Sequence, residues 1–81
     1  MRSKEYMEMF IQDYELGEKV PREVFYCKDE NGYILVDNSK GKCRMFLFKY
    51  ESSCLVFLSR NVEQISLQLR ELEIVKEYFD G

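Results

Sequence analysis

The sequence predicts an α+β fold in which a four-stranded antiparallel meander is flanked by an N-terminal and a C-terminal helix, in the order α-β-β-β-β-α. Three observations predict it. Apolar residues recur at helical spacing near both ends, β-branched and aromatic runs fill the middle, and turn signals separate those runs. A chain of 81 residues with 46% apolar residues has room for one hydrophobic core, so a single small globular domain spanning residues 1–81 is expected.

A first helix is expected from about Lys4 to Leu16, with Ser3 as its N-cap and Gly17 in the left-handed turn that ends it. Its apolar face follows the spacing i, i+3, i+4, i+7 and consists of Met7, Phe10, Ile11 and Tyr14. The opposite side carries an acidic stripe made of Glu5, Glu8, Gln12 and Glu15. The helix is therefore amphipathic, with its acidic side toward solvent.

The next two segments predict a β-hairpin. Strands over residues 24–27 and 33–36 flank Asp29-Glu30-Asn31-Gly32, in which Asn-Gly is the strongest short-range hairpin signal, with a loop of either two or four residues. Directly opposed residues share a face of the sheet. Phe25 and Cys27 are therefore expected on the face that carries Ile34 and Val36.

Two further strands are expected over residues 43–50 and 54–58. Both have apolar residues at odd and at even positions, which indicates strands whose two faces are at least partly covered. The loop at residues 37–41 precedes the third strand, and Glu51-Ser52-Ser53 separates the third from the fourth. A meander is the simplest topology for four such strands.

A last helix is expected from Val62 to Phe79. One apolar stripe holds Val62, Ile65, Leu69, Leu72 and Phe79, and a second, on the other side of the helix, holds Leu67, Ile74 and Tyr78. Strand-like alternation over residues 65–69 is a competing interpretation. Either the first helix covers the second stripe, or the stripe is exposed and forms an interface with a protein partner or a second copy of the chain.

Several chemistries are not expected. The chain has no histidine, so His-dependent nucleophile pairs and His metal ligands are excluded. Cys27, Cys43 and Cys54 are odd in number and widely spaced, which favours buried apolar fillers over a disulfide framework or a zinc site. We expect no catalytic, metal or cofactor-binding residues and no enzyme activity. Without a signal peptide or an apolar run long enough to span a bilayer, the expected location is the cytoplasm.

Charge is distributed unevenly. Residues 1–37 hold five basic and nine acidic groups, residues 38–60 hold five and one, and residues 61–81 hold two and five. The basic middle permits a nucleic-acid site in which Lys40, Lys42 and Arg44 contact phosphate while aromatic residues stack on bases. The candidate stacking residues are Phe46, Phe48 and Tyr50. The simpler interpretation is a polar surface in which the basic strands face the acidic helices.

The leading functional hypothesis is a small protein-binding module that inhibits or regulates a larger macromolecular machine. Its interface candidates are the second stripe (Leu67, Ile74, Tyr78) and the acidic residues Glu5, Glu8 and Glu15. In size, acidity and lack of histidine the chain is similar to many phage- and plasmid-encoded inhibitors of host systems, including anti-CRISPR proteins. This resemblance implies a mobile-element origin and a protein target. The alternatives are a small nucleic-acid-binding domain that uses residues 40–44 and a structural accessory subunit.

Overall fold

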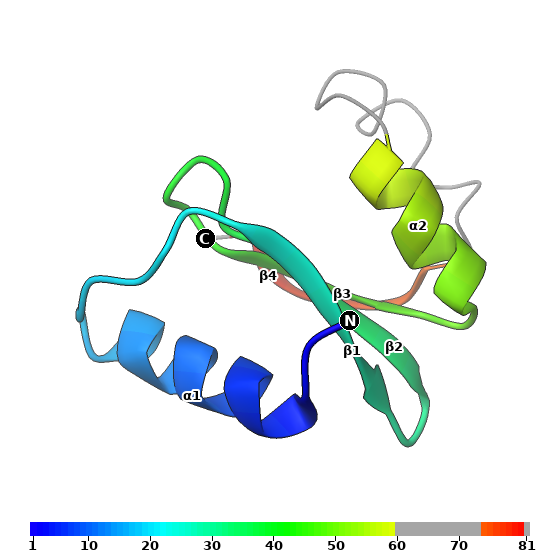
Figure 1. The fold of residues 1–81 in the computed structure, drawn as a ribbon, viewed down its shortest axis with the longest axis horizontal. Coiled ribbons are helices and arrows are strands. Elements are labelled where there is room, and N and C mark those ends of the chain that lie inside the picture. Colours follow the sequence, from blue (N-terminus) through cyan, green and yellow to red (C-terminus); the bar gives the residue numbers. More distant parts are fainter. Residues whose placement is uncertain (60–73, 81) are drawn as a thin grey trace.

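A computed structural model describes residues 1–59 and 74–80 of the chain and shows the predicted α+β class (Figure 1). Two helices and four strands occur in these residues. In chain order they are α1 (Lys4–Glu15), β1 (Val24–Asp29), β2 (Gly32–Asp37), β3 (Arg44–Phe48), α2 (Glu51–Ser59) and β4 (Ile74–Asp80).

The first three strands form the expected antiparallel meander, and β4 pairs with the free edge of β3. The hairpin between β1 and β2 has a two-residue loop, because Asp29 pairs with Gly32. The side chain of Asp29 supports this loop by accepting a hydrogen bond from the backbone N–H of Asn31 at 3.1 Å. Phe25 pairs with Val36 and Cys27 with Ile34, so the predicted sharing of a face is confirmed.

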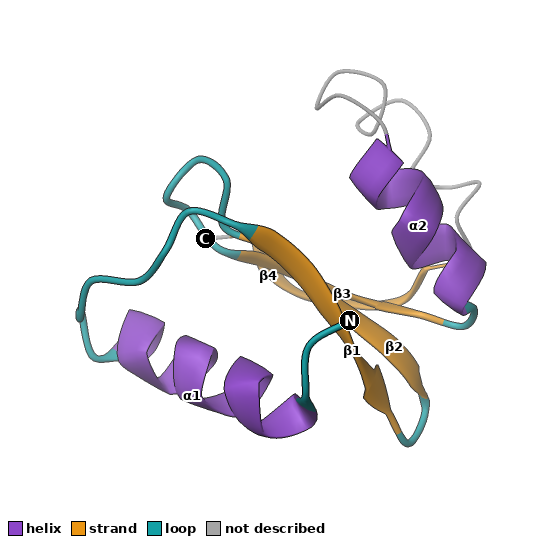
Figure 2. Cartoon of the chain, in the orientation of Figure 1, coloured by secondary structure: helices purple, strands orange, loops and turns teal. Residues whose placement is uncertain are grey.

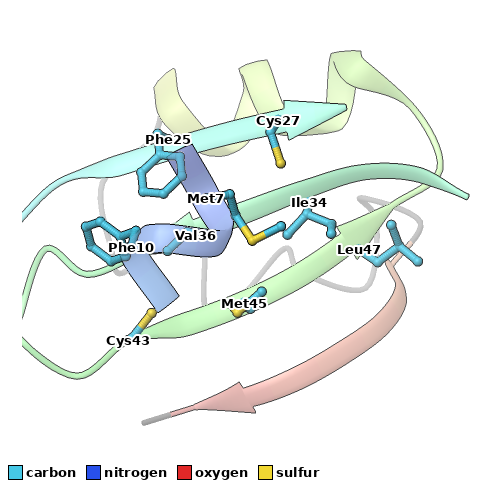
Figure 3. Packing of buried hydrophobic residues seen from close by; sticks show 9 residues of the cluster. All are labelled: Met7, Phe10, Phe25, Cys27, Ile34, Val36, Cys43, Met45 and Leu47. Carbon is cyan, nitrogen blue, oxygen red and sulfur yellow. The ribbon is translucent and has the colours of Figure 1, made fainter. Parts of the chain in front are cut away.

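Helix α1 covers one face of the sheet, as its apolar spacing predicts. Ser3 caps its N-terminus by accepting a hydrogen bond from the backbone N–H of Tyr6 at 3.1 Å, and Gly17 adopts the left-handed conformation beyond its end. Met7 and Phe10 are buried against strand residues of this face (Figure 3). The strand residues of this first cluster are Phe25, Cys27, Ile34, Val36, Met45 and Leu47, and Cys43, which directly precedes β3, also belongs to it.

Helix α2 covers the opposite face. Alternate strand residues point away from α1, and with α2 they form a second cluster made of Tyr26, Leu35, Phe46, Phe48, Cys54 and Phe57. Figure 2 shows the two helices on opposite sides of the sheet. The interior strands therefore have apolar residues at successive positions because both of their faces are buried.

The predicted fourth strand over residues 54–58 is wrong, because these residues lie in α2. The buried residues of α2 are Ser53, Cys54 and Phe57, a spacing that places them on one side of a helix. A run that is apolar at every position has no period that separates a buried strand from a buried helix. The second face of the sheet needs a cover, and α2 provides it.

The predicted helix from Val62 to Phe79 is wrong in its last part, since residues 74–80 form β4; residues 62–73 lie outside the described residues. The proposed second stripe is lost with it, because Ile74 and Tyr78 lie on a strand and Leu67 is outside the described residues. Local composition favoured a helix, but β3 would otherwise present an unpaired edge, and pairing with β4 satisfies its backbone groups.

Candidate functional site

The three cysteines lie in the interior with free thiols. Burial raises the pKa of Cys43 to about 11 and that of Cys54 to about 12, and desolvation also raises the pKa of Cys27. A thiol of such high pKa is protonated at neutral pH and is a poor nucleophile. Their position agrees with the predicted role of cysteine as an apolar filler.

Residues 1–59 and 74–80 contain no group of three or more Cys, Asp or Glu residues placed to hold a metal ion. None of the helices in this part of the chain has the length and apolar character needed to cross a membrane.

The predicted acidic stripe lies on the exposed side of α1, where Glu5, Glu8 and Glu15 all face solvent. Two large apolar side chains accompany them: Met9 is 65% exposed and Leu16 is 67% exposed. Met9 and Leu16 are seven positions apart, and a separation of seven residues returns to the same side of a helix. We call the set Glu5, Glu8, Met9, Gln12, Glu15 and Leu16 the α1 outer face.

The carboxylates of the α1 outer face have no basic partner within the described residues. The ion pairs found there join Arg2 to Glu23 at 3.3 Å and Lys4 to Asp29 at 3.1 Å. Lys4, the basic residue of α1, is therefore directed to the hairpin rather than to the acidic side of its own helix. Glu8 adds only the smallest of the contributions that raise the pKa of Lys4, so Lys4 offsets the charge of the α1 outer face weakly.

Helix α2 also exposes apolar groups. Leu55 is 52% exposed, and Leu58 lies three positions further along the same helix, also exposed. Tyr50, which precedes α2, is exposed as well, and the Lys49 ammonium lies 5.3 Å from the centre of its ring.

The structure leaves the predicted phosphate-contacting lysines accessible but not two of the predicted base-stacking rings. Lys40 and Lys42 are exposed in the loop before β3, while Arg44 is half-buried, with its guanidinium 4.9 Å from the centre of the Phe46 ring. Stacking of bases on Phe46 or Phe48 is contradicted, because both rings are fully buried in the second cluster. The strand pattern suggested that the sheet face carrying these two residues was open to solvent, but α2 covers that face.

The fold brings two further basic residues, Lys19 and Arg22, toward this loop. The Arg22 guanidinium packs against Gly41: a Cβ at Gly41 would lie 3.2 Å from its Nη2. Lys19, Arg22 and Gly41 line a pocket of about 550 Å³ together with Asn38, which is buried. The loop is held to the preceding linker because the side-chain Nδ2 of Asn38 donates a hydrogen bond to the Pro21 carbonyl at 2.9 Å.

Sequence reasoning missed two sets of surface residues. Met9 and Leu16 lie outside the apolar face of α1, and an exposed apolar residue taken singly has no signal in the periodicity. Lys19 and Arg22 belong to the acidic N-terminal part of the chain, so a charge count by segment assigned them to the wrong group. The contact of the Arg22 guanidinium with Gly41 places Arg22 at the loop that carries Lys40 and Lys42.

Comparison of the chain with protein-family models, with curated proteins and with solved structures finds no match.

Proposed function

We propose that this chain is a non-enzymatic module that inhibits or regulates a larger macromolecular machine by binding one of its proteins through the α1 outer face. The observation that carries the proposal is the position of two exposed apolar side chains, Met9 and Leu16, among three carboxylates without basic partners. Interfaces commonly combine a few large apolar anchors with a polar or charged surround that sets specificity.

Glu5 lies in the first turn, where its charge is favourable for the helix dipole, but two other electrostatic features of this face disfavour α1, which supports a role in recognition. Glu5 and Glu8 are three positions apart, where like charges repel by about 0.2–0.5 kcal/mol. Glu15 is the last residue of α1, near the negative end of the helix dipole, and the last turn has no basic residue to offset it. A basic partner surface would relieve both repulsions.

The chemistry of the face also limits what the partner is. A complementary surface would be basic and would offer a shallow apolar depression for Met9 and Leu16. A second copy docked through the same face by two-fold symmetry would place carboxylates against carboxylates, which disfavours a homodimer through this surface. Nucleic acid is disfavoured for the same reason, because its phosphates carry the same sign of charge.

Affinity capture with matched variants tests the proposal. The chain is immobilised and exposed to nuclease-treated lysate of cells that carry its gene, and retained proteins are identified by mass spectrometry. The test variant is Glu8→Lys with Glu15→Lys. The control variant is Glu18→Lys with Glu30→Lys, which makes the same charge change at two exposed positions outside the α1 outer face.

We expect the wild type and the control variant to retain the same protein, and the test variant to lose it by tenfold or more. Circular dichroism melting of both variants checks that the fold survives. Retention of one protein equally by all three chains would reject the α1 outer face. A parallel capture uses lysate without nuclease, and retention of nucleic acid alone in that capture would reject a protein target.

A further inference from the structure

Strand β1 lies at an edge of the sheet, with β2 as its one neighbour among the described strands. The Glu23 carbonyl accepts a hydrogen bond from the backbone N–H of Asn38 at 2.9 Å, and in an antiparallel pair every second residue repeats such a bond. The backbone groups of the residues between, Val24, Tyr26 and Lys28, therefore point away from β2. An edge with outward N–H and C=O groups is a template for pairing with another strand.

Residues 1–3 pass beside this edge (Figure 1). The backbone N–H of Arg2 donates a hydrogen bond to the Tyr26 carbonyl at 2.9 Å. Arg2 Nη2 also donates to the Glu23 carboxylate at 3.3 Å, and its guanidinium carbon lies 4.5 Å from the centre of the Tyr6 ring. Three contacts of one residue thus hold residues 1–3, which we call the Arg2 strap, at the middle of the edge.

The Arg2 strap is held weakly and covers only part of the edge. It makes one backbone hydrogen bond to β1, and a groove of about 390 Å³ lined by Arg2, Val24, Tyr26 and Leu58 of α2 remains beside it. The Arg2 side chain is 51% exposed, and ion pairs that are so exposed contribute little to stability. No residue of the strap belongs to either hydrophobic cluster, so the strap can detach while the core stays intact.

We propose that the Arg2 strap keeps the chain monomeric by covering an edge that otherwise pairs with β1 of a second copy. The outward residues are arranged symmetrically about Tyr26. Antiparallel pairing of two copies therefore places Tyr26 opposite itself and Val24 opposite Lys28, so that each outward N–H meets an outward C=O. The Tyr26 carbonyl exchanges its bond with Arg2 for one with the second copy. The symmetry is two-fold, so the assembly closes at a dimer.

The charges on the α2 side of the sheet favour a second copy as the occupant. Val24 and Tyr26 pack on this side, so Lys28 of the second copy would lie opposite Val24 and diagonal to Tyr26. The Tyr26 hydroxyl donates a hydrogen bond to the Glu51 carboxylate at 2.8 Å. A long side chain reaches its diagonal neighbour across two strands, so this lysine would bring a cation toward Glu51.

The α1 side of the sheet is compatible with the same pairing. Phe25 would face Cys27 of the second copy, which places a large ring beside a small side chain. At each end Glu23 would face Asp29, and like charges directly opposite one another are unfavourable. Lys4, whose Nζ lies 3.1 Å from the Asp29 carboxylate, supplies a cation between these two carboxylates.

Light scattering behind size exclusion, over a series of protein concentrations, tests the proposal with four variants. Arg2→Pro removes both the backbone N–H and the guanidinium, whereas Arg2→Ala removes the guanidinium alone. Lys19→Pro is the control, because it makes the same change at an exposed residue of the linker between α1 and β1. Arg2→Pro with Val24→Pro also removes one outward N–H of the edge, a position where a strand accepts proline.

We expect the wild type, the Lys19→Pro control and the double variant to be monomers. Arg2→Pro should form dimers at least about tenfold more tightly than the wild type, since strand pairing draws on the freed main-chain groups. Arg2→Ala should lie between the two, because it keeps the hydrogen bond to the Tyr26 carbonyl. Circular dichroism melting checks that each variant is folded.

Amide hydrogen exchange of the Arg2→Pro dimer locates the interface without any further substitution. The amides of Val24, Tyr26 and Lys28 should exchange at least about tenfold more slowly than in the wild type, because pairing buries them in a ladder. The amides of Phe25 and Cys27 point toward β2 in both states and should not change.

Four results would overturn the proposal: an Arg2→Pro variant that stays monomeric, equal association of Arg2→Pro and Lys19→Pro, assemblies larger than a dimer, and a dimer in which the outward β1 amides exchange as fast as in the wild type. None of these results bears on the α1 outer face, which shares no residue with the Arg2 strap or with β1. The two proposals therefore fail independently.

Discussion

Gly32 begins β2 with a φ of +146°, a backbone conformation that L side chains rarely adopt, and a Cβ at this position would overlap the carbonyl oxygen of Phe48 on β3. The hairpin therefore needs glycine for two reasons, the backbone conformation and the close approach of the neighbouring strand. Gly17, at the end of α1, needs glycine for the first reason only, because its surroundings are open.

Gly32→Ala should lower the free energy of unfolding by at least about 2 kcal/mol, since backbone strain and overlap with β3 act together. Gly17→Ala should cost about 1 kcal/mol, the strain of a left-handed alanine alone. Urea denaturation followed by circular dichroism measures both. Equal losses in the two variants would mean that β3 does not approach Gly32 as closely as described.

Asn38 holds the β2–β3 loop to the linker that precedes β1. Its backbone N–H donates to the Glu23 carbonyl and its side-chain Nδ2 to the Pro21 carbonyl, both at 2.9 Å. These two bonds connect the β2–β3 loop to the linker that precedes β1. Any residue except proline could make the backbone bond, but the bond to the Pro21 carbonyl needs the side-chain amide of asparagine.

At the scale of the element, α2 is apolar nearly all around, and its register on the sheet decides which side chains are buried. Phe57 is buried in the second cluster, whereas Leu55 is 52% exposed. In the strand that the sequence predicts over residues 54–58, these two residues would lie on the same face, because positions i and i+2 share a face. A pair of truncations therefore distinguishes the helix from the strand.

Phe57→Ala should lower the free energy of unfolding by about 3–5 kcal/mol, the usual cost of removing a buried aromatic side chain. Leu55→Ala should change it by less than about 1 kcal/mol, because most of that side chain is already in water. Chemical denaturation of the two variants provides the comparison. Similar losses at both positions would favour the strand and contradict α2.

The sequence was informative where a segment has a clear period or a specific turn residue. The extent of α1, the Asn31-Gly32 hairpin and the shared face of Phe25 and Val36 follow from such local signals. Residues 54–58 are all apolar and therefore show no periodicity that separates a helix from a strand. They form a helix because the second face of the sheet must be covered. Residues 74–80 include both helix-favouring and strand-favouring side chains, and pairing with β3 makes them a strand.

The candidate surfaces likewise divide into those that a local sequence pattern predicts and those that depend on tertiary contacts. The exposure of Glu5, Glu8 and Glu15 follows from the amphipathic pattern of α1, which could be read from the sequence. The pocket lined by Lys19, Arg22 and Asn38 depends on contacts between segments about twenty residues apart, and no local pattern predicts such contacts. The burial of Phe46 and Phe48 likewise depends on α2, an element that the sequence did not reveal.

At the scale of the whole molecule, helices on both faces of the sheet place all three cysteines in the interior. Burial makes the charged thiolate unfavourable in the folded chain, which is why the pKa values of Cys43 and Cys54 rise to about 11 and about 12. In the unfolded chain the same thiols return to their ordinary pKa, near 9. This difference links global stability to pH.

We expect the free energy of unfolding to stay constant with respect to these thiols below about pH 9 and to fall as the pH rises toward 11 and 12. Between the unfolded and the folded pKa, the unfolded chain has lost protons that the folded chain retains, so rising pH favours unfolding by up to about 1.4 kcal/mol per pH unit for each thiol. Urea denaturation at intervals from pH 7 to pH 10.5 measures the slope.

The Cys43→Ala/Cys54→Ala variant provides the control, because its stability is lower at every pH but should fall less steeply above pH 9. Tyr6 and Tyr26 donate hydrogen bonds to carboxylates, which raise their pKa values, so they add a fall in the same direction above pH 10 in both chains. A wild-type stability that stays level or rises from pH 9 to pH 10 would show that these thiols are open to solvent, and the arrangement of the two helices over the sheet would then be wrong.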